Sequence, residues 1–246
     1  MKRFISYTFV LILLASCGGK QGPVKNPQTD NKPLTPNEDR GIKEITGFYG
    51  GDCTYSQGKT PSKTGAIRYF KLQVTNSSAL DKVENIAPLS TANIAITFYN
   101  SLERERMNFD EIQSVILFSD GKKVENHFSA KSLDQVLMKM STVLKVIGYL
   151  KEKNYDSLSS VIDDKNGLTV FNKKALIKEI KSADDTLGNI KEFVPYGFAF
   201  FKTKDQKRNI LHISGVIVRD KLNNEFSVDI DADSDKEQVL MISYKI

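Results

Sequence analysis

The stretch SLDQVLMKMSTVLKVIGYLKEK, residues 132–153, is the most strongly patterned part of the 246-residue chain and decides its fold. Apolar side chains recur in it every three or four residues, which is the spacing of one face of an α-helix. Ser132 followed by Gln135 has the form of a capping box and predicts where the helix begins. The apolar face is long enough for us to expect a helix that bridges two halves of the protein. Its members are Leu133, Val136, Leu137, Met140, Val143, Leu144, Ile147 and Leu150.

After this helix, helical patterns come first and strand patterns follow. The segments YDSLSSVID (155–163) and NKKALIKEIKSA (172–183) predict two further helices. Four strand-like runs, separated by short polar turns, then have the pattern of an antiparallel meander. Helices followed by a run of strands predict an α+β domain, which we assign to residues 131–246. The runs are KEFVPYGFAFFK (191–202), NILHISGVIVRD (209–220), EFSVDIDA (225–232) and EQVLMISYKI (237–246).

The order of these elements resembles the cystatin-like fold of nuclear transport factor 2-like domains. The resemblance rests on KNYDSLSSVIDD (153–164), a helix, and then the strand segments GFAFF, LHISGVIV, FSVDI and VLMISYKI, and it covers roughly Leu133 to Ile246. It implies helices packed on a curled antiparallel sheet with a concave pocket. Enzymes of that superfamily place an Asp, Tyr or His in the pocket, where an apolar wall tunes its pKa.

The half that precedes the bridging helix predicts a smaller α+β module, residues 46–130. AIRYFKLQV (66–74) alternates apolar and polar side chains, as a half-buried strand does. A helical face follows over residues 94–102, and Asp120-Gly121 suits a two-residue hairpin turn between two strands. We therefore expect a small mixed sheet with one helix packed across it. The buried side of the first strand is formed by Phe70, Leu72 and Val74.

Residues 1–16 have the organisation of an export signal. Lys2 and Arg3 precede the uncharged segment FISYTFVLILLA, which is shorter than the roughly 20 residues of a membrane-spanning helix. LASC, residues 14–17, resembles a bacterial lipobox, in which the cysteine receives a diacylglycerol and becomes the first residue. The resemblance implies that Cys17 is acylated, with fatty chains such as palmitate, and anchors the protein in a membrane. The alternative is a plain secretory signal in which Cys17 is incidental.

The resemblance also implies a location. Gly18, rather than Asp, follows the cysteine, and in two-membrane bacteria lipoproteins of that kind are passed to the outer membrane. The chain as a whole resembles envelope lipoproteins common in Bacteroidota. Residues 17–45 hold four of the seven prolines and few apolar side chains, so we expect a flexible linker there.

Charge and cysteine content exclude several classes of protein. The formal net charge is +5, and removal of the leader takes away Lys2 and Arg3. A small excess spread through a chain without tryptophan does not predict nucleic-acid binding. Cys53 is the one cysteine besides Cys17, so an intramolecular disulfide is not expected. A lone cysteine is usually an inert, partly buried residue rather than a nucleophile.

No motif of catalysis, phosphate binding or metal binding is complete. His212 should share a strand face with Ser214 and Val216, and we expect a histidine bonded to a neighbour rather than a catalytic one. Asp229, Asp231 and Asp233 have the spacing of a calcium loop, but its later positions fail, which favours a strand that ends in an Asx turn. We therefore predict no catalytic residue, metal or cofactor. The candidates for lining a ligand pocket are His212, Tyr196, Phe198 and Phe200.

The leading hypothesis is a lipid-anchored cell-envelope protein that acts as a non-catalytic binding or interaction module. Its partners would be the membrane, through Cys17, and an unidentified envelope protein or small ligand, with no nucleic acid. The alternative is an enzyme, or a small-ligand carrier, that uses the concave pocket of the C-terminal sheet.

Overall fold

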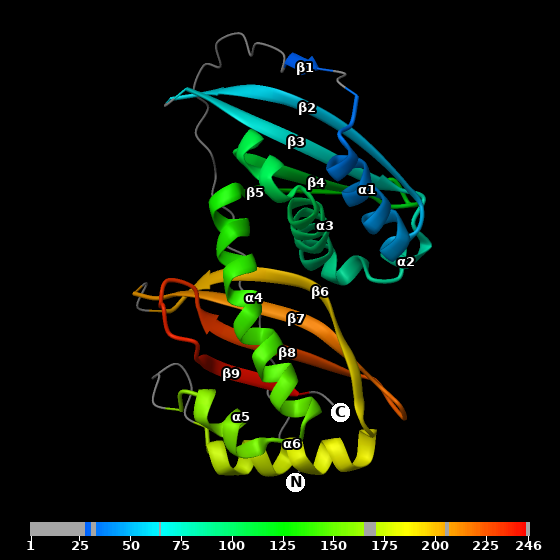
Figure 1. Cartoon of the computed structure of the whole chain (residues 1–246). Coiled ribbons are helices and arrows are strands. Elements are labelled where there is room, and N and C mark those ends of the chain that lie inside the picture. The colour runs from blue at the N-terminus through cyan, green and yellow to red at the C-terminus, as the bar shows by residue number, and fades with distance from the viewer. Residues whose placement is uncertain (1–27, 31–32, 64, 165–170, 205–206, 245–246) are drawn as a thin grey trace.

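The computed structural model describes residues 28–30, 33–63, 65–164, 171–204 and 207–244 (Figure 1). Helices and two open sheets make up these residues, which confirms the α+β prediction. The predicted signal peptide, residues 1–16, and the predicted lipidation site, Cys17, lie outside the described residues. In the part of the chain that the structure describes, no helix is long and apolar enough to span a membrane.

The first sheet has the strand order β1-β2-β3-β4-β5. Strands β3 and β4 are parallel, whereas the other neighbours are antiparallel. A parallel pair needs a long crossover, and the helical segment between β3 and β4 supplies it. The strands are β1 (Gln28–Asp30), β2 (Asp52–Ser62), β3 (Gly65–Thr75), β4 (Glu111–Leu117) and β5 (Lys123–Ser129).

The alternation predicted for β3 is confirmed, because Phe70, Leu72 and Val74 are fully buried. The hairpin predicted around Asp120 and Gly121 also forms, but the two-residue turn is wrong. Strand β4 ends at Leu117 and β5 begins at Lys123, and of the two turn residues only Gly121 has a positive φ, of 86°. The Asp120 side chain instead accepts a hydrogen bond from the backbone N–H of Lys122.

The crossover consists of α2 (Ser78–Asp81), the 3₁₀ turn η1 (Glu84–Ile86), α3 (Ala87–Ser101) and the 3₁₀ segment η2 (Glu103–Asn108). Helix α3 is the central element of the fold. It is buried on nearly all sides because it contacts α1 and the first sheet and also β6 of the second sheet. Its side chains are apolar or small around most of the helix, as such burial requires.

Helix α4 (Ala130–Lys151) is the long helix predicted from its apolar face. It runs from the first sheet across the second (Figure 1). Its N-cap is Ser129, whose hydroxyl accepts from the backbone N–H of Ser132, so the predicted start at Ser132 was wrong by about one turn. Seven of the eight predicted side chains are buried or half-buried, but Leu144 is 56 % exposed.

The second sheet is an antiparallel meander in the order β6-β7-β8-β9, as predicted. Helices α5 (Tyr155–Val161) and α6 (Lys173–Leu187) precede it. On the face that these helices and α4 cover, Leu211, Ile213 and Ile217 belong to the core. The strands are β6 (Ile190–Lys202), β7 (Asn209–Arg219), β8 (Asn224–Asp231) and β9 (Val239–Tyr244).

The predicted linker 17–45 is wrong over its last part, because Pro36–Tyr49 forms helix α1. Thr35 and Glu38 make a full capping box, and proline is compatible with the first turn of a helix. Ile45, on the inner face of α1, is fully buried. Residues 28–30 of the predicted linker form β1. Polar composition had concealed these elements, since only one face of α1 needs to be apolar.

Candidate functional site

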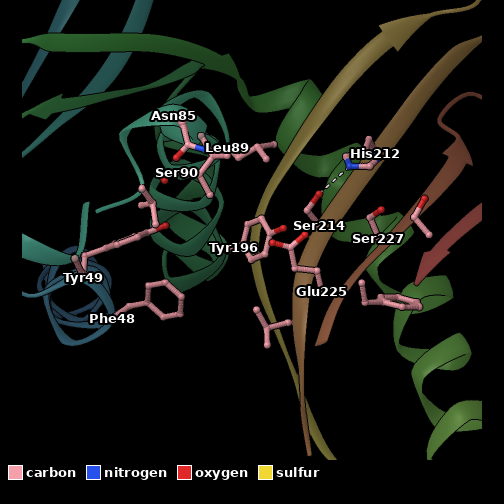
Figure 2. A pocket seen from close by; sticks show the side chains of 16 residues that line it. Phe48, Tyr49, Asn85, Leu89, Ser90, Tyr196, His212, Ser214, Glu225 and Ser227 are labelled. Carbon is pink, nitrogen blue, oxygen red and sulfur yellow. Dashed lines mark hydrogen bonds between the residues drawn. The ribbon is translucent and has the colours of Figure 1, made fainter. Parts of the chain in front are cut away.

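A cleft of about 790 Å³ lies between helices of the first half and one face of the second sheet (Figure 2). Its volume is in the range of small-molecule sites. One wall comes from the end of α1 and the α2–η1–α3 segment, and the other comes from strands β6 to β9. The lining residues are Phe48, Tyr49, Ala79, Val83, Asn85, Ile86, Leu89, Ser90, Tyr196, His212, Ser214, Val216, Glu225, Phe226, Ser227 and Ser243.

The helical wall is mainly apolar and presents an aromatic pair. Phe48 and Tyr49 are adjacent at the end of α1, with ring centroids 4.7 Å apart in an edge-to-face arrangement. Phe48 is 47 % exposed, whereas Tyr49 is buried. The Tyr49 hydroxyl accepts a hydrogen bond of 2.9 Å from Nδ2 of Asn93. Burial raises the pKa of Tyr49 to about 12, so its hydroxyl is neutral at physiological pH.

The sheet wall carries a row of small residues that the strand register aligns. Gly197 of β6 is opposite Ser214 of β7, Ser214 is opposite Ser227 of β8, and Ser227 is opposite Ser243 of β9. Directly opposed residues on neighbouring strands point to the same face. The register therefore places three hydroxyls in line on the sheet wall of the cleft.

Gly197 explains how closely α3 approaches the sheet wall. A Cβ atom at Gly197 would lie 2.5 Å from the carbonyl oxygen of Leu89, which is shorter than any normal contact. Only a residue without a side chain allows the start of α3 to lie against β6 here. Leu89 itself lines the cleft, so this contact fixes the distance between its two walls.

His212 of β7 connects Ser214, a member of the serine row, to Asp229 of β8. Its Nδ1 lies 2.6 Å from Oδ1 of Asp229, and its Nε2 lies 2.7 Å from Oγ of Ser214. Asp229 is opposite His212 on β8, and Ser214 is two residues further along β7. The three groups thus form a hydrogen-bonded chain on two central strands, and Figure 2 shows its Ser214 end.

The chemistry of the three groups fixes the direction of this chain. An ionised carboxylate only accepts hydrogen bonds, so the proton between Asp229 and His212 belongs to Nδ1. In a neutral imidazole Nε2 is then the acceptor, and the Ser214 hydroxyl donates to it. The His212 and Asp229 side chains are 30 % and 18 % exposed, and Ser214 is 4 % exposed. The chain is thus largely shielded but opens on the cleft.

The structure brings two of the four predicted pocket residues to the cleft. Tyr196 and His212 line it. Phe198 and Phe200 do not, because they are opposite Ile213 and Leu211 and so point to the other face of the sheet. There Phe198 is buried and makes edge-to-face contacts with Phe128 and Phe200. The expectation that His212 is bonded to a neighbour is confirmed.

The acidic run ends its strand as predicted. The Asp231 carboxylate accepts from the backbone N–H of Asp233, which is an Asx turn. Asp229 bonds His212, whereas Asp233 accepts from Gln135 of α4. No group of three potential metal-ligating side chains occurs within the described ranges.

Cys53 lies in β2, half-buried, and does not line the cleft. Burial raises the pKa of its thiol to about 12. Since the thiolate is the nucleophilic form of cysteine, this environment suppresses reactivity. The partial burial expected for Cys53 is confirmed.

Sequence reasoning missed Ser214, Ser227 and Asp229 as parts of one site. The signal was present in the alternation of β7 and β8, but the register between the strands was needed to join them. In comparisons with known proteins, no family model, no curated protein and no solved structure matches the chain.

Proposed function

We propose that the protein is a lipid-anchored protein of the cell envelope that binds a small amphipathic ligand in the cleft. The observation that supports this most directly is the contrast between the two walls. The helical wall is apolar and includes Phe48, whereas the sheet wall that faces it presents the hydroxyls of Ser214, Ser227 and Ser243. A ligand with an apolar part and a hydrogen-bonding part would fit both walls.

Phe48 supplies the energetic argument. A large aromatic side chain that stays 47 % exposed at the mouth of a cleft retains apolar surface that a ligand can cover. Complete burial of a phenylalanine side chain is worth about 1.5–3 kcal/mol, so covering the half of Phe48 that is still exposed would contribute about half of that. The hydroxyls of the sheet wall would then orient the polar part of the ligand.

Anchoring through Cys17 is the second part of the proposal and rests on the lipobox resemblance of LASC. The lack of Asp after the cysteine supports the outer membrane as the destination. Acyl chains on one residue would hold the protein stably, because two or more chains give firm attachment and one chain does not.

The binding proposal is tested with an apolar fluorescent probe, 1-N-phenylnaphthylamine, titrated into the purified protein. Phe48→Ser should raise the dissociation constant about tenfold, the equivalent of about 1.4 kcal/mol. Phe201→Ser is the matched control, because Phe201 is also 46 % exposed but does not line the cleft. Equal affinities of the two variants, or no binding by the parent, would refute binding in this cleft.

The anchoring proposal has its own experiment. The parent expressed with its leader should partition into the detergent phase of Triton X-114 and should show an acyl mass increment on the peptide that begins at Cys17. Cys17→Ser should move to the aqueous phase without that increment. Aqueous partition of the parent, or an unmodified Cys17 thiol, would overturn the anchor and leave the cleft unaffected.

A further inference from the structure

We propose that Ser214, His212 and Asp229 form a nucleophilic site that cleaves a carboxylic ester bound in the cleft. The inference deepens the proposed binding function and rests on it, because the ester is the polar part of the amphipathic ligand. It follows from the distances of 2.7 Å and 2.6 Å that join the three side chains.

The order of groups is that of a serine nucleophile, a histidine base and a carboxylate that orients the base. Asp229 holds the Nδ1 proton and leaves the Nε2 lone pair directed at the Ser214 hydroxyl. His212 and Ser214 are on one strand, and Asp229 is on the next. Neighbouring strands of a sheet hold such groups more rigidly than loops do.

The cleft also provides donors for the negative charge that develops on the ester oxygen. Ser227 is directly opposite Ser214 across the β7–β8 ladder. Its hydroxyl, like that of Ser243, has no hydrogen-bond partner among the described residues and is available to a ligand. We assign the Ser227 hydroxyl to the ester oxygen, since preorganised donors at that position stabilise the transition state.

The other lining residues indicate the class of substrate. Leu89 lies against Gly197, the residue opposite Ser214, and Tyr196 precedes Gly197 on β6. Both line the cleft and bring apolar surface close to the nucleophile. A short apolar acyl group would be accommodated there, with the alcohol part toward the open side near Phe48. The substrate class is therefore an ester of a short-chain carboxylic acid.

The reaction balances without a co-reactant other than water. Oγ of Ser214 forms a bond to the carbonyl carbon while its proton passes to Nε2 of His212. The bond from that carbon to the alcohol oxygen then breaks, and Nε2 returns the proton to the leaving alcohol. Water, deprotonated by the same Nε2, cleaves the acyl-serine to the free acid and restores the Ser214 hydroxyl.

The test uses a fluorophosphonate probe, which reacts with activated serines with loss of fluoride, and p-nitrophenyl butyrate as the ester. The parent should be labelled at Ser214, as shown by peptide mass spectrometry, and should release p-nitrophenol. Ser214→Ala should abolish both signals. His212→Gln should slow both at least 100-fold, because a general base contributes that much or more. Asp229→Asn, which keeps the size of the side chain, should also slow both.

His127→Gln is the matched control. His127 also contacts carboxylates, Glu111 and Glu125, but it is exposed and lies outside the cleft. Its labelling and hydrolysis should equal those of the parent, and thermal melting should show that every variant is folded. Absence of Ser214 labelling in the folded parent, or labelling unchanged in His212→Gln, would overturn the inference. Binding of 1-N-phenylnaphthylamine would still report separately on the cleft.

Discussion

Arg219, at the end of β7, and Asp184, on α6, form a fully buried ion pair with an N–O distance of 2.5 Å. Their side chains are 0 % and 2 % exposed. The Arg219 guanidinium also donates to the Gly188 carbonyl and to the Asn224 side chain, and the Tyr155 hydroxyl donates to Asp184. The pair therefore joins α5 and α6 to the sheet that carries the candidate site.

Removing one member of this pair should destabilise the protein strongly. Burial raises the pKa of Asp184 and lowers that of Arg219, so each charge depends on the other. Asp184→Asn should lower the free energy of unfolding by about 3–5 kcal/mol, because it leaves a buried guanidinium uncompensated. Urea denaturation measures the loss. The double variant Asp184→Leu with Arg219→Met should lose less free energy of unfolding than Asp184→Asn alone, because it leaves no buried charge. A double variant whose loss equals the sum of the losses of its two single variants would contradict this.

Gly197→Ala should disturb the contact between the two halves. The new methyl group would overlap the carbonyl oxygen of Leu89, and overpacking of this kind costs about 1–3 kcal/mol. Because Leu89 also lines the cleft, affinity for 1-N-phenylnaphthylamine should fall as well. Thermal melting and the probe titration measure the two effects.

The control for this substitution is Gly47→Ala on α1, where nothing lies within 4 Å of the added methyl group. A glycine inside a helix destabilises a protein by about 0.5–1 kcal/mol relative to alanine, so Gly47→Ala should be slightly more stable than the parent. If Gly197→Ala behaved like Gly47→Ala, the close approach of α3 to β6 would not exist in solution.

The strongly periodic parts of the fold could be predicted from the sequence. Phe70, Leu72 and Val74 alternate because one face of β3 is buried, and the face of α4 repeats because the helix covers both halves. Helix α1 was missed because its polar residues and Pro36 resemble a linker. Its signal was local: Thr35 and Glu38 have capping-box spacing, and Ile45 provides a core contact.

The candidate site could be predicted only in part. Alternation placed His212 and Ser214 on one face, but pairing His212 with Asp229 required the register of β7 against β8. The β7–β8 ladder starts with Ile217 opposite Asn224. Because Ile217 lies several residues before the polar turn, the turn residues do not determine which residues of the two strands are opposed. The helical wall with Phe48 comes from the other half of the chain, and no local pattern connects it to β7.

Replacing Ser114 of β4 by alanine should leave the stability of the protein unchanged or raise it. Ser114 is fully buried, and its hydroxyl is the one buried side-chain polar atom without a hydrogen-bond partner in the described part of the chain. Ser114→Ala removes an unsatisfied group, so the free energy of unfolding should stay equal or rise by about 1 kcal/mol. Denaturation in urea checks this.

Ser77→Ala is the contrasting variant, since Ser77 is also buried but its hydroxyl donates to the Tyr49 carbonyl and caps α2. That variant should lose about 1–2 kcal/mol. A loss of similar size in Ser114→Ala would show that its hydroxyl does have a partner.

The ion pairs of Glu125 on β5 should make the stability of the protein depend on pH in the acid range. Glu125 lies 2.6 Å from Nζ of Lys71 and 2.5 Å from Nζ of Lys123. Burial acts to raise its pKa, but the hydrogen bonds and charges of the two lysines outweigh burial and hold the pKa at about 2. A carboxyl group whose folded pKa is below its unfolded value of 4.5 stabilises the fold above pH 4.5. This contribution is lost as the pH falls through about 2.

Glu125→Gln should therefore be less stable than the parent at pH 7, by about 1 kcal/mol for a partly exposed ion-pair network. The difference should shrink between pH 4.5 and pH 2, because in that interval the parent loses the contribution that the variant lacks. Urea denaturation at a series of pH values measures it. Glu152→Gln, at the exposed end of α4, is the matched control and should be about as stable as the parent at pH 7. A difference for Glu125→Gln that stays constant down to pH 2 would mean that the lysines do not hold this carboxylate in its charged form.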